Sequence, residues 1–275
     1  MSAASTSIPP PAPPVPLREQ ITRAITGLIA QVGQISESFL HCVRVLFKRP
    51  LEVHEIILQM EALGVASLGI VVVTSVFIGM VMSTQFAFGL QKFGGMEYTG
   101  RVVALSFARE LAPTFTAVIV GGRIGAGMTA ELGSMAVTEQ LDAVRALGAD
   151  PIKKLVMPRL VATVLVMPFL ASFALVLGFS GAMFITDWQF NVPASFFFRS
   201  ALETVNLKDY VAGVGKTPFF GVIIAMIGCH FGMHTSGGTA GVGNSTTRTV
   251  VAISIAILIA DFFLTKLAIV LWTLF

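Results

Sequence analysis

A long polar stretch separates two apolar segments of this chain and decides how the rest is interpreted. It runs from residue 121 to residue 159 and reads GGRIGAGMTAELGSMAVTEQLDAVRALGADPIKKLVMPR. The flanking segments are Val102–Gly121 and Leu160–Ile185, each near the roughly 20 residues that a membrane-spanning helix needs. Because a turn between two spans needs only a few residues, the stretch predicts a surface on which a soluble partner docks.

Three more apolar segments have similar length: Val65–Phe88, Val211–Met233 and Val250–Phe275. Of the 275 residues, 55% are hydrophobic and 12% are charged, whereas soluble domains carry roughly 25% charged residues. The bilayer is therefore the expected solvent. The sequence predicts an all-α membrane protein in which residues 51–275 form one domain with five transmembrane helices. The formal charge of +3 is typical of basic cytosolic loops and does not indicate nucleic acid as a partner.

The N-terminal region has two parts. Residues 1–16 are rich in Ser, Ala and Pro and lack the apolar core of a signal peptide, so we expect a disordered cytosolic tail. Residues 17–50 place apolar side chains at helical spacing among arginines, and Pro50 ends the pattern. Such an amphipathic helix lies in the membrane interface and does not span it.

Basic residues outside the spans predict the orientation. Most of them lie in residues 17–50, in the polar stretch and at Arg248, which places these regions and the N-terminus in the cytosol of a bacterial inner membrane. The C-terminus is then periplasmic. The opposite side carries only Lys92, Arg101, Arg199 and Lys208. Its loop from Asp187 to Lys208 contains three consecutive phenylalanines, Phe196 to Phe198, and predicts a short helix on the outer interface.

The centre of the polar stretch, Met135–Leu147, predicts one short helix. Val137, Leu141 and Val144 share a face, and Gly148 with Pro151 provides a stop signal. The polar side chains that would meet a partner are Glu139, Gln140, Asp142 and Arg145. A solvated amphipathic loop helix is the alternative. A docking helix explains the length of the stretch better, and the spacing from Asp142 to Gly148 partly resembles the coupling motif of ABC importer permeases.

Several motifs together resemble the MlaE/YrbE family of ABC permeases. They occur in order at both predicted cytosolic loops, and the resemblance covers about residues 20–275. They are Arg109-Glu110-Leu-Ala-Pro113, Gly122-Arg123, Thr129-Ala-Glu131-Leu-Gly133, Val137-Thr-Glu139-Gln-Leu141-Asp142-Ala, Asp150-Pro151-Ile, Pro158-Arg159, Gly241-Val-Gly243, Thr246-Thr-Arg248-Thr-Val-Val251 and Asp261-Phe.

The resemblance implies a homodimeric permease that moves phospholipid or a related lipid and supports outer-membrane lipid asymmetry. It implies a separate cytosolic ABC ATPase, an extracytoplasmic MCE-domain lipid-binding protein and often a STAS-domain subunit as partners. The family's coupling helix maps onto Met135–Leu147. The flanks Arg123–Glu131 and Asp150–Arg159 are then candidate hinges that pass ATPase motion into the second and third spans.

Four charged residues lie within or beside apolar segments: Arg109, Glu110, Lys216 and Asp261. A charge at the centre of a membrane helix costs at least ~2.5–3.5 kcal/mol. Neighbours in a helix point about 100° apart, so Arg109 and Glu110 need different partners. We expect Arg109 and Glu110 to pair with Asp261 and Lys216 in a neutral polar network along the lipid path, with structural bridges as the alternative.

Two other patterns point to weaker hypotheses. The segment Gly238–Ser245 resembles a phosphate loop, but Asn244 stands where the loop needs lysine. We interpret it as a glycine-rich turn, so the chain is not expected to be an enzyme or to hold a cofactor, and ATP with Mg²⁺ would bind the partner ATPase. His230 and His234 have the spacing of metal ligands, but no further ligand cluster accompanies them, and no metal site is predicted.

Two other function classes stay open at this point. An ion-coupled transporter could use the buried charges, but it would not need the polar stretch and no inverted repeat is visible. A membrane-embedded lipid-modifying enzyme would need a compact set of His, Asp or Ser at the interface, and no such motif is found.

Overall fold

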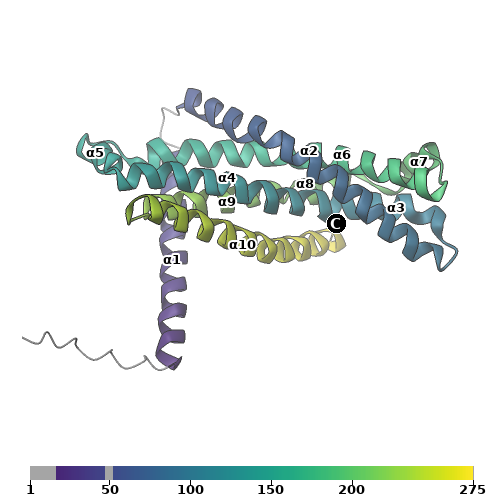
Figure 1. Cartoon of the computed structure of the whole chain (residues 1–275), viewed down its shortest axis with the longest axis horizontal. Helices are drawn as coiled ribbons and strands as arrows, with labels where there is room; N and C mark the ends of the chain where they lie inside the picture. The colour runs from purple at the N-terminus through teal and green to yellow at the C-terminus, as the bar shows by residue number, and fades with distance from the viewer. Residues whose placement is uncertain (1–16, 47–51, 275) are drawn as a thin grey trace, which may run out of the picture.

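The structure, a computed structural model, describes residues 17–46 and 52–274, and the elements in these residues are helical (Figure 1). The helices are α1 (Leu17–Leu46), α2 (Val53–Gln91), η1 (Met96–Tyr98), α3 (Thr99–Ser106), η2 (Phe107–Leu111), α4 (Ala112–Val137), α5 (Gln140–Ala146), η3 (Ile152–Val156), α6 (Met157–Phe190), α7 (Ala194–Thr204), α8 (Leu207–Val214), α9 (Thr217–Met233) and α10 (Gly238–Leu274).

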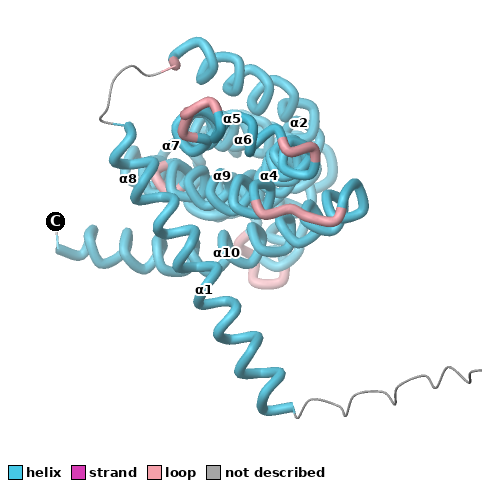
Figure 2. Tube along the Cα trace, turned by 90° about the vertical axis from the view of Figure 1, so that its left-hand side faces the viewer, coloured by secondary structure: helices cyan, strands magenta, loops and turns pink. Residues whose placement is uncertain are grey.

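Five helical stretches of the described residues are long and apolar enough to cross a membrane. They are Val53–Gln91, Met96–Val137, Ile152–Phe190, Leu207–Met233 and Gly238–Leu271. The predicted N-terminal helix is also present as α1, and it stands at a wide angle to the bundle of spans (Figures 1 and 2). The predicted fold class is therefore confirmed. The expected N-terminal tail and residues 47–50 lie outside the described residues.

The bundle is built from two tightly packed groups of helices. Helix α2 packs mainly on α6, and α4 packs on α9 and α10. Gly79 and Gly178 allow the first contact, because a Cβ on Gly79 would lie 1.9 Å from the Gly178 carbonyl oxygen. Thr129 links the second group, since its hydroxyl donates to the Gly228 carbonyl at 2.9 Å and lies 2.8 Å from the Thr249 hydroxyl.

The polar stretch is shorter as a connection than the sequence suggests. Residues 121–137 continue α4, where they form part of its buried face. Their charged side chains have partners on other helices: Arg123 donates to the Ser67 hydroxyl at 2.7 Å, and Glu131 meets Arg159 at 2.6 Å. The stretch Met96–Val137 has 42 residues and is about 63 Å long, so it extends well beyond a hydrocarbon core of roughly 30 Å.

The single helix predicted for Met135–Leu147 is wrong in one respect. Helix α4 ends at Val137, the Thr138 hydroxyl donates to the Ser134 carbonyl at 2.8 Å, and Glu139 takes a left-handed φ of 60° before α5 begins. The periodicity hid this break, because Val137, Leu141 and Val144 keep helical spacing in the sequence across it, and Leu141 is buried and Val144 half-buried in α5.

The other local predictions had mixed outcomes. The short helix expected among the three phenylalanines is present as α7, with Phe197 buried. The glycine-rich turn expected at Gly238–Ser245 is instead the first part of α10. The chain reverses earlier, over His234–Gly237, where Gly237 has a φ of +88° that glycine adopts without strain.

Candidate functional site

The second span changes its helical geometry where its two charges lie. Residues Phe107–Leu111 form a π-helical turn in which the Ala112 N–H bonds to the Phe107 carbonyl. Pro113 has no N–H for the Arg109 carbonyl four residues earlier, which favours this local widening. π turns occur often at functional sites because they reorient side chains.

The fourth span is interrupted at its own charge. Helix α8 ends at Val214, and Lys216 lies in the two-residue break before α9. Pro218 cannot donate to the Val214 carbonyl. The Thr217 hydroxyl donates to that carbonyl instead, at 2.7 Å. Ser and Thr side chains commonly bond in this way to backbone groups that a break in a membrane helix leaves without a partner. Discontinuous membrane helices often carry the binding sites of transporters.

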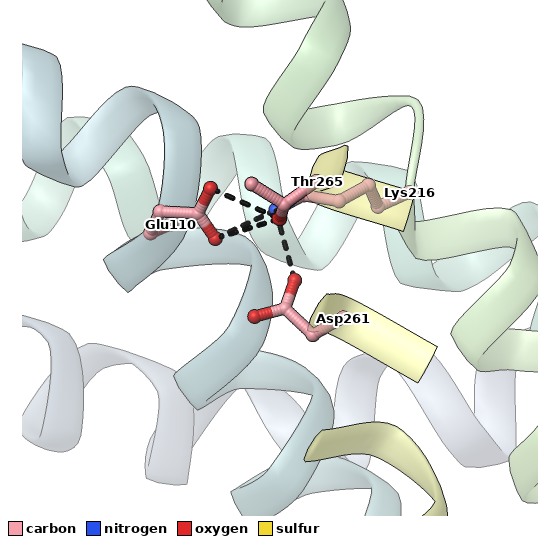
Figure 3. Close-up of polar contacts among 4 residues, drawn as sticks. All are labelled: Glu110, Lys216, Asp261 and Thr265. Atoms are coloured by element: carbon pink, nitrogen blue, oxygen red, sulfur yellow. Dashed lines mark hydrogen bonds and ion pairs between the residues drawn. The ribbon is translucent and has the colours of Figure 1, made fainter. Parts of the chain in front are cut away.

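These two irregular segments and α10 bring four side chains together, the group we call the polar network: Glu110, Lys216, Asp261 and Thr265 (Figure 3). The Lys216 ammonium donates to Glu110 Oε2 at 2.7 Å, to Asp261 Oδ1 at 2.8 Å and to the Thr265 hydroxyl at 3.0 Å. The Thr265 hydroxyl donates to Glu110 Oε1 at 3.1 Å. The Lys216 side chain is 5% exposed, Asp261 17% and Glu110 40%. The network is buried at the lysine and open at Glu110.

Arg109 has a different partner from the one that the sequence suggested. Its Nε donates to Asp209 Oδ1 at 2.7 Å, and Asp209 is buried on α8. Gly213 permits this approach, because a Cβ there would lie 1.9 Å from the Ala108 carbonyl oxygen on the π turn. Arg109 and Glu110 thus reach different elements, as their angular separation requires.

Asp209 and Thr265 were not predicted from the sequence. Asn206 and Asp209 have the spacing of a helix N-cap, and Asp209 Oδ2 accepts from the Asn206 N–H at 2.8 Å, so the motif indicates a cap and not an ion pair. With Asp209 included, three carboxylates accompany two cations. The four residues predicted from the sequence balance in charge, whereas the five charged residues that the structure brings together have one carboxylate in excess.

The predicted docking residues lie at one end of the bundle. Helix α5 lies at the end opposite α7 (Figure 1), and Glu139, Gln140, Asp142 and Arg145 are exposed. Gly148, at a φ of +75°, ends the helix, with the Gly148 and Ala149 N–H groups bonded to the Arg145 and Val144 carbonyls. This pair of hydrogen bonds is a Schellman motif. Helix α5 is thus a short helix between left-handed residues at Glu139 and Gly148, and its charged side chains are exposed.

Polar contacts link the segments on both sides of α5. Arg159 of α6, with a buried side chain, meets Glu131 of α4 at 2.6 Å. His41 of α1 meets Asp150 at 2.9 Å, and Asp150 also accepts from the Ile152 N–H at 2.9 Å. These contacts join α1, α4 and α6 to the segments on both sides of α5.

His230 and His234 contact each other, with ring centroids 4.4 Å apart, and the His234 Nδ1 lies 2.8 Å from the His230 carbonyl oxygen. Within residues 17–46 and 52–274, no three His, Cys, Asp or Glu side chains are grouped as metal ligands would be.

Comparison with known proteins identifies the family. A family model described as Permease MlaE matches residues 56–267. The chain belongs to the MlaE permease family. It is 40% identical over 252 residues to a probable ABC transporter permease protein of Synechocystis sp., an alignment that covers 91% of this chain and 94% of that protein.

Two further relatives come from a plant and a bacterium. Protein TRIGALACTOSYLDIACYLGLYCEROL 1, chloroplastic, of Arabidopsis thaliana is 40% identical over 208 residues, which are 76% of this chain and 59% of that protein. A probable ABC transporter permease protein of Rickettsia typhi is 37% identical over 222 residues, 81% of this chain and 86% of the relative. This MlaE-family chain is a multi-pass ABC transporter permease subunit, and not an enzyme.

Proposed function

We propose that this MlaE-family permease moves a phospholipid or a related lipid between a bacterial inner membrane and an extracytoplasmic MCE-domain protein. The Arabidopsis relative is named after a lipid, trigalactosyldiacylglycerol, which supports a lipid as cargo. The observation that carries the mechanism is the polar network at the break in the fourth span, because buried charges joined across three spans mark a path or a moving part in membrane proteins.

The energy comes from a separate cytosolic ATPase that docks on α5. The charges of Asp142 and Arg145 on α5, and of its N-cap residue Glu139, are exposed, whereas Leu141 of α5 is buried. Along α4, the distance from Val137 back to Glu110 is about 40 Å at 1.5 Å per residue. Helix α4 is therefore a rigid connection from the dock to the polar network, and Arg159–Glu131 couples α6 to it.

The functional unit is a homodimer with its N-terminus and α5 in the cytosol and its C-terminus in the periplasm. The partner ATPase supplies the sites for ATP and Mg²⁺, and a STAS-domain subunit can complete the complex. Helix α10 offers a long face for the second copy, since Ile255, Ile259 and Phe262 are exposed there.

The docking role is tested by reversing the charges of α5. The variant Glu139→Lys, Asp142→Lys, Arg145→Glu is expected to lose co-purification with the ATPase and the permease-dependent stimulation of ATP hydrolysis, at least tenfold. Lys92→Glu, a reversal of an exposed charge at the far end of α2, is the matched control. Unchanged association and stimulation in the triple variant would show that α5 is not the dock.

The cargo is tested by purifying the permease with its ATPase and identifying bound lipid by mass spectrometry. A co-purified phospholipid that is released on ATP hydrolysis supports the proposal. ATP-driven ion movement without lipid release would contradict it.

A further inference from the structure

An apolar pocket lies between α3, α6 and α7, at the end of the bundle opposite α5. It has a volume of about 300 Å³, at the lower end of the range of ligand pockets. Helices α3, α6 and α7 form its walls, with Ala104, Val176, Phe179, Ser180 and Leu202 among the lining residues. Helices α3 and α7 lie together at this end (Figure 1).

The wall of this pocket offers almost no hydrogen-bonding groups. Ser180 is its one polar lining side chain among the described residues, and its hydroxyl already donates to the Val176 carbonyl at 2.7 Å. Phe179 packs against Phe197 and Phe198 at centroid distances of 5.3 and 6.2 Å. A hydrocarbon chain is the ligand that such a wall accepts.

About one helical turn from lining residues, α3 and α7 carry charged side chains, here called the rim, whose charge pattern suits a phosphate. Arg101 of α3 and Arg199 of α7 both contact one carboxylate, Glu203, at 3.6 and 3.2 Å. The two guanidiniums exceed the carboxylate by one positive charge, which matches one phosphodiester. Tyr98 holds the Arg101 guanidinium, 5.7 Å from its ring centroid.

The charges and the pocket share the same helix faces. Arg101 precedes the lining residue Ala104 by three residues, and Arg199 precedes Leu202 by three, so each arginine lies one turn from the pocket on the same face. Arginine pairs with phosphate oxygens in two-point hydrogen bonds, which fixes a headgroup above an apolar site.

We propose that this arrangement is a binding site for one phospholipid of the outer leaflet, with its phosphate on Arg101 and Arg199 and an acyl chain in the pocket between α3, α6 and α7. The site is separate from the polar network and does not depend on which cargo the permease transports, although its assignment to the outer leaflet rests on the proposed orientation.

The test uses the full-length permease in nanodiscs that contain a phosphatidylglycerol probe with a diazirine in one acyl chain. After irradiation, the labelled residues are mapped by mass spectrometry. Labelling is expected at exposed lining residues such as Val176 and Leu202. Arg101→Gln with Arg199→Gln should reduce it about tenfold, the loss of roughly one charge-assisted contact.

Two further variants separate the contributions of the rim and the pocket. Ser180→Phe adds a ring to the pocket without removing a contact between helices, and it should also reduce labelling. Lys208→Gln removes an exposed cation near this end of the bundle, on α8, and should leave labelling unchanged.

Three outcomes would overturn the proposal. One is unchanged labelling in the double arginine variant. Another is equal labelling by a diacylglycerol probe with the same diazirine chain, because that lipid has no phosphate. The last is loss of labelling when the MCE-domain partner is present, which would assign the pocket to a protein helix.

Discussion

Replacing Lys216 with Met is expected to destabilise the permease and to stop transport. Lys216 is the one cation that the described contacts place between Glu110 and Asp261, at 2.7 and 2.8 Å. Its removal leaves the two neighbouring carboxylates, Glu110 and Asp261, without this cation inside the membrane span. Breaking a buried ion pair by removing one partner costs about 3–5 kcal/mol. We expect the lower end, about 3 kcal/mol, because Glu110 is 40% exposed.

The charge count predicts an order of effects among variants. Asp261→Asn leaves one lysine with one glutamate, so it should cost only about 1 kcal/mol, the value of one hydrogen bond. The triple variant Lys216→Met, Glu110→Gln, Asp261→Asn removes all three charges together. Its stability should return toward that of the wild type, because replacing a whole buried ionic group is often neutral.

Stability is measured by thermal unfolding in detergent, and transport by ATP-dependent transfer of fluorescent phospholipid in proteoliposomes that contain the ATPase. The triple variant should be stable but unable to transport. If it transports like the wild type, the network only holds the helices together. If Lys216→Met is as stable as Asp261→Asn, the reasoning from charge count is wrong.

Two other predictions test packing and burial. Gly79→Val should disrupt the contact between α2 and α6 and lower the yield of folded protein, whereas Gly69→Ala, which has open space around the Cβ position, should not. Burial, with a smaller effect of Asp150, raises the pKa of the Cys42 thiol to about 11. Less thiolate is therefore present than at a cysteine with the ordinary pKa of about 9. In a Cys229→Ser background, iodoacetamide should modify native Cys42 at pH 8 about 100-fold more slowly than unfolded Cys42, and the native rate should rise with pH up to about 11. Equal native and unfolded rates would show that Cys42 is accessible.

Local periodicity and composition were sufficient for the fold class. Each apolar segment identifies a helix by itself, because a membrane helix satisfies its backbone hydrogen bonds internally. The same argument found α1, α7 and the charges of the polar network. It did not find the break at Thr138–Glu139, because Val137, Leu141 and Val144 keep their helical spacing across it.

The partners of the charges depended on tertiary structure. The sequence showed that Arg109 and Glu110 must face different elements, since neighbours in a helix diverge. It could not show that Arg109 reaches Asp209 or that Lys216 reaches Asp261, because those contacts join residues 100 and 45 positions apart. They depend on how the helices rotate against each other, on the π turn at Phe107–Leu111 and on the close approach at Gly213, which only the packed bundle decides.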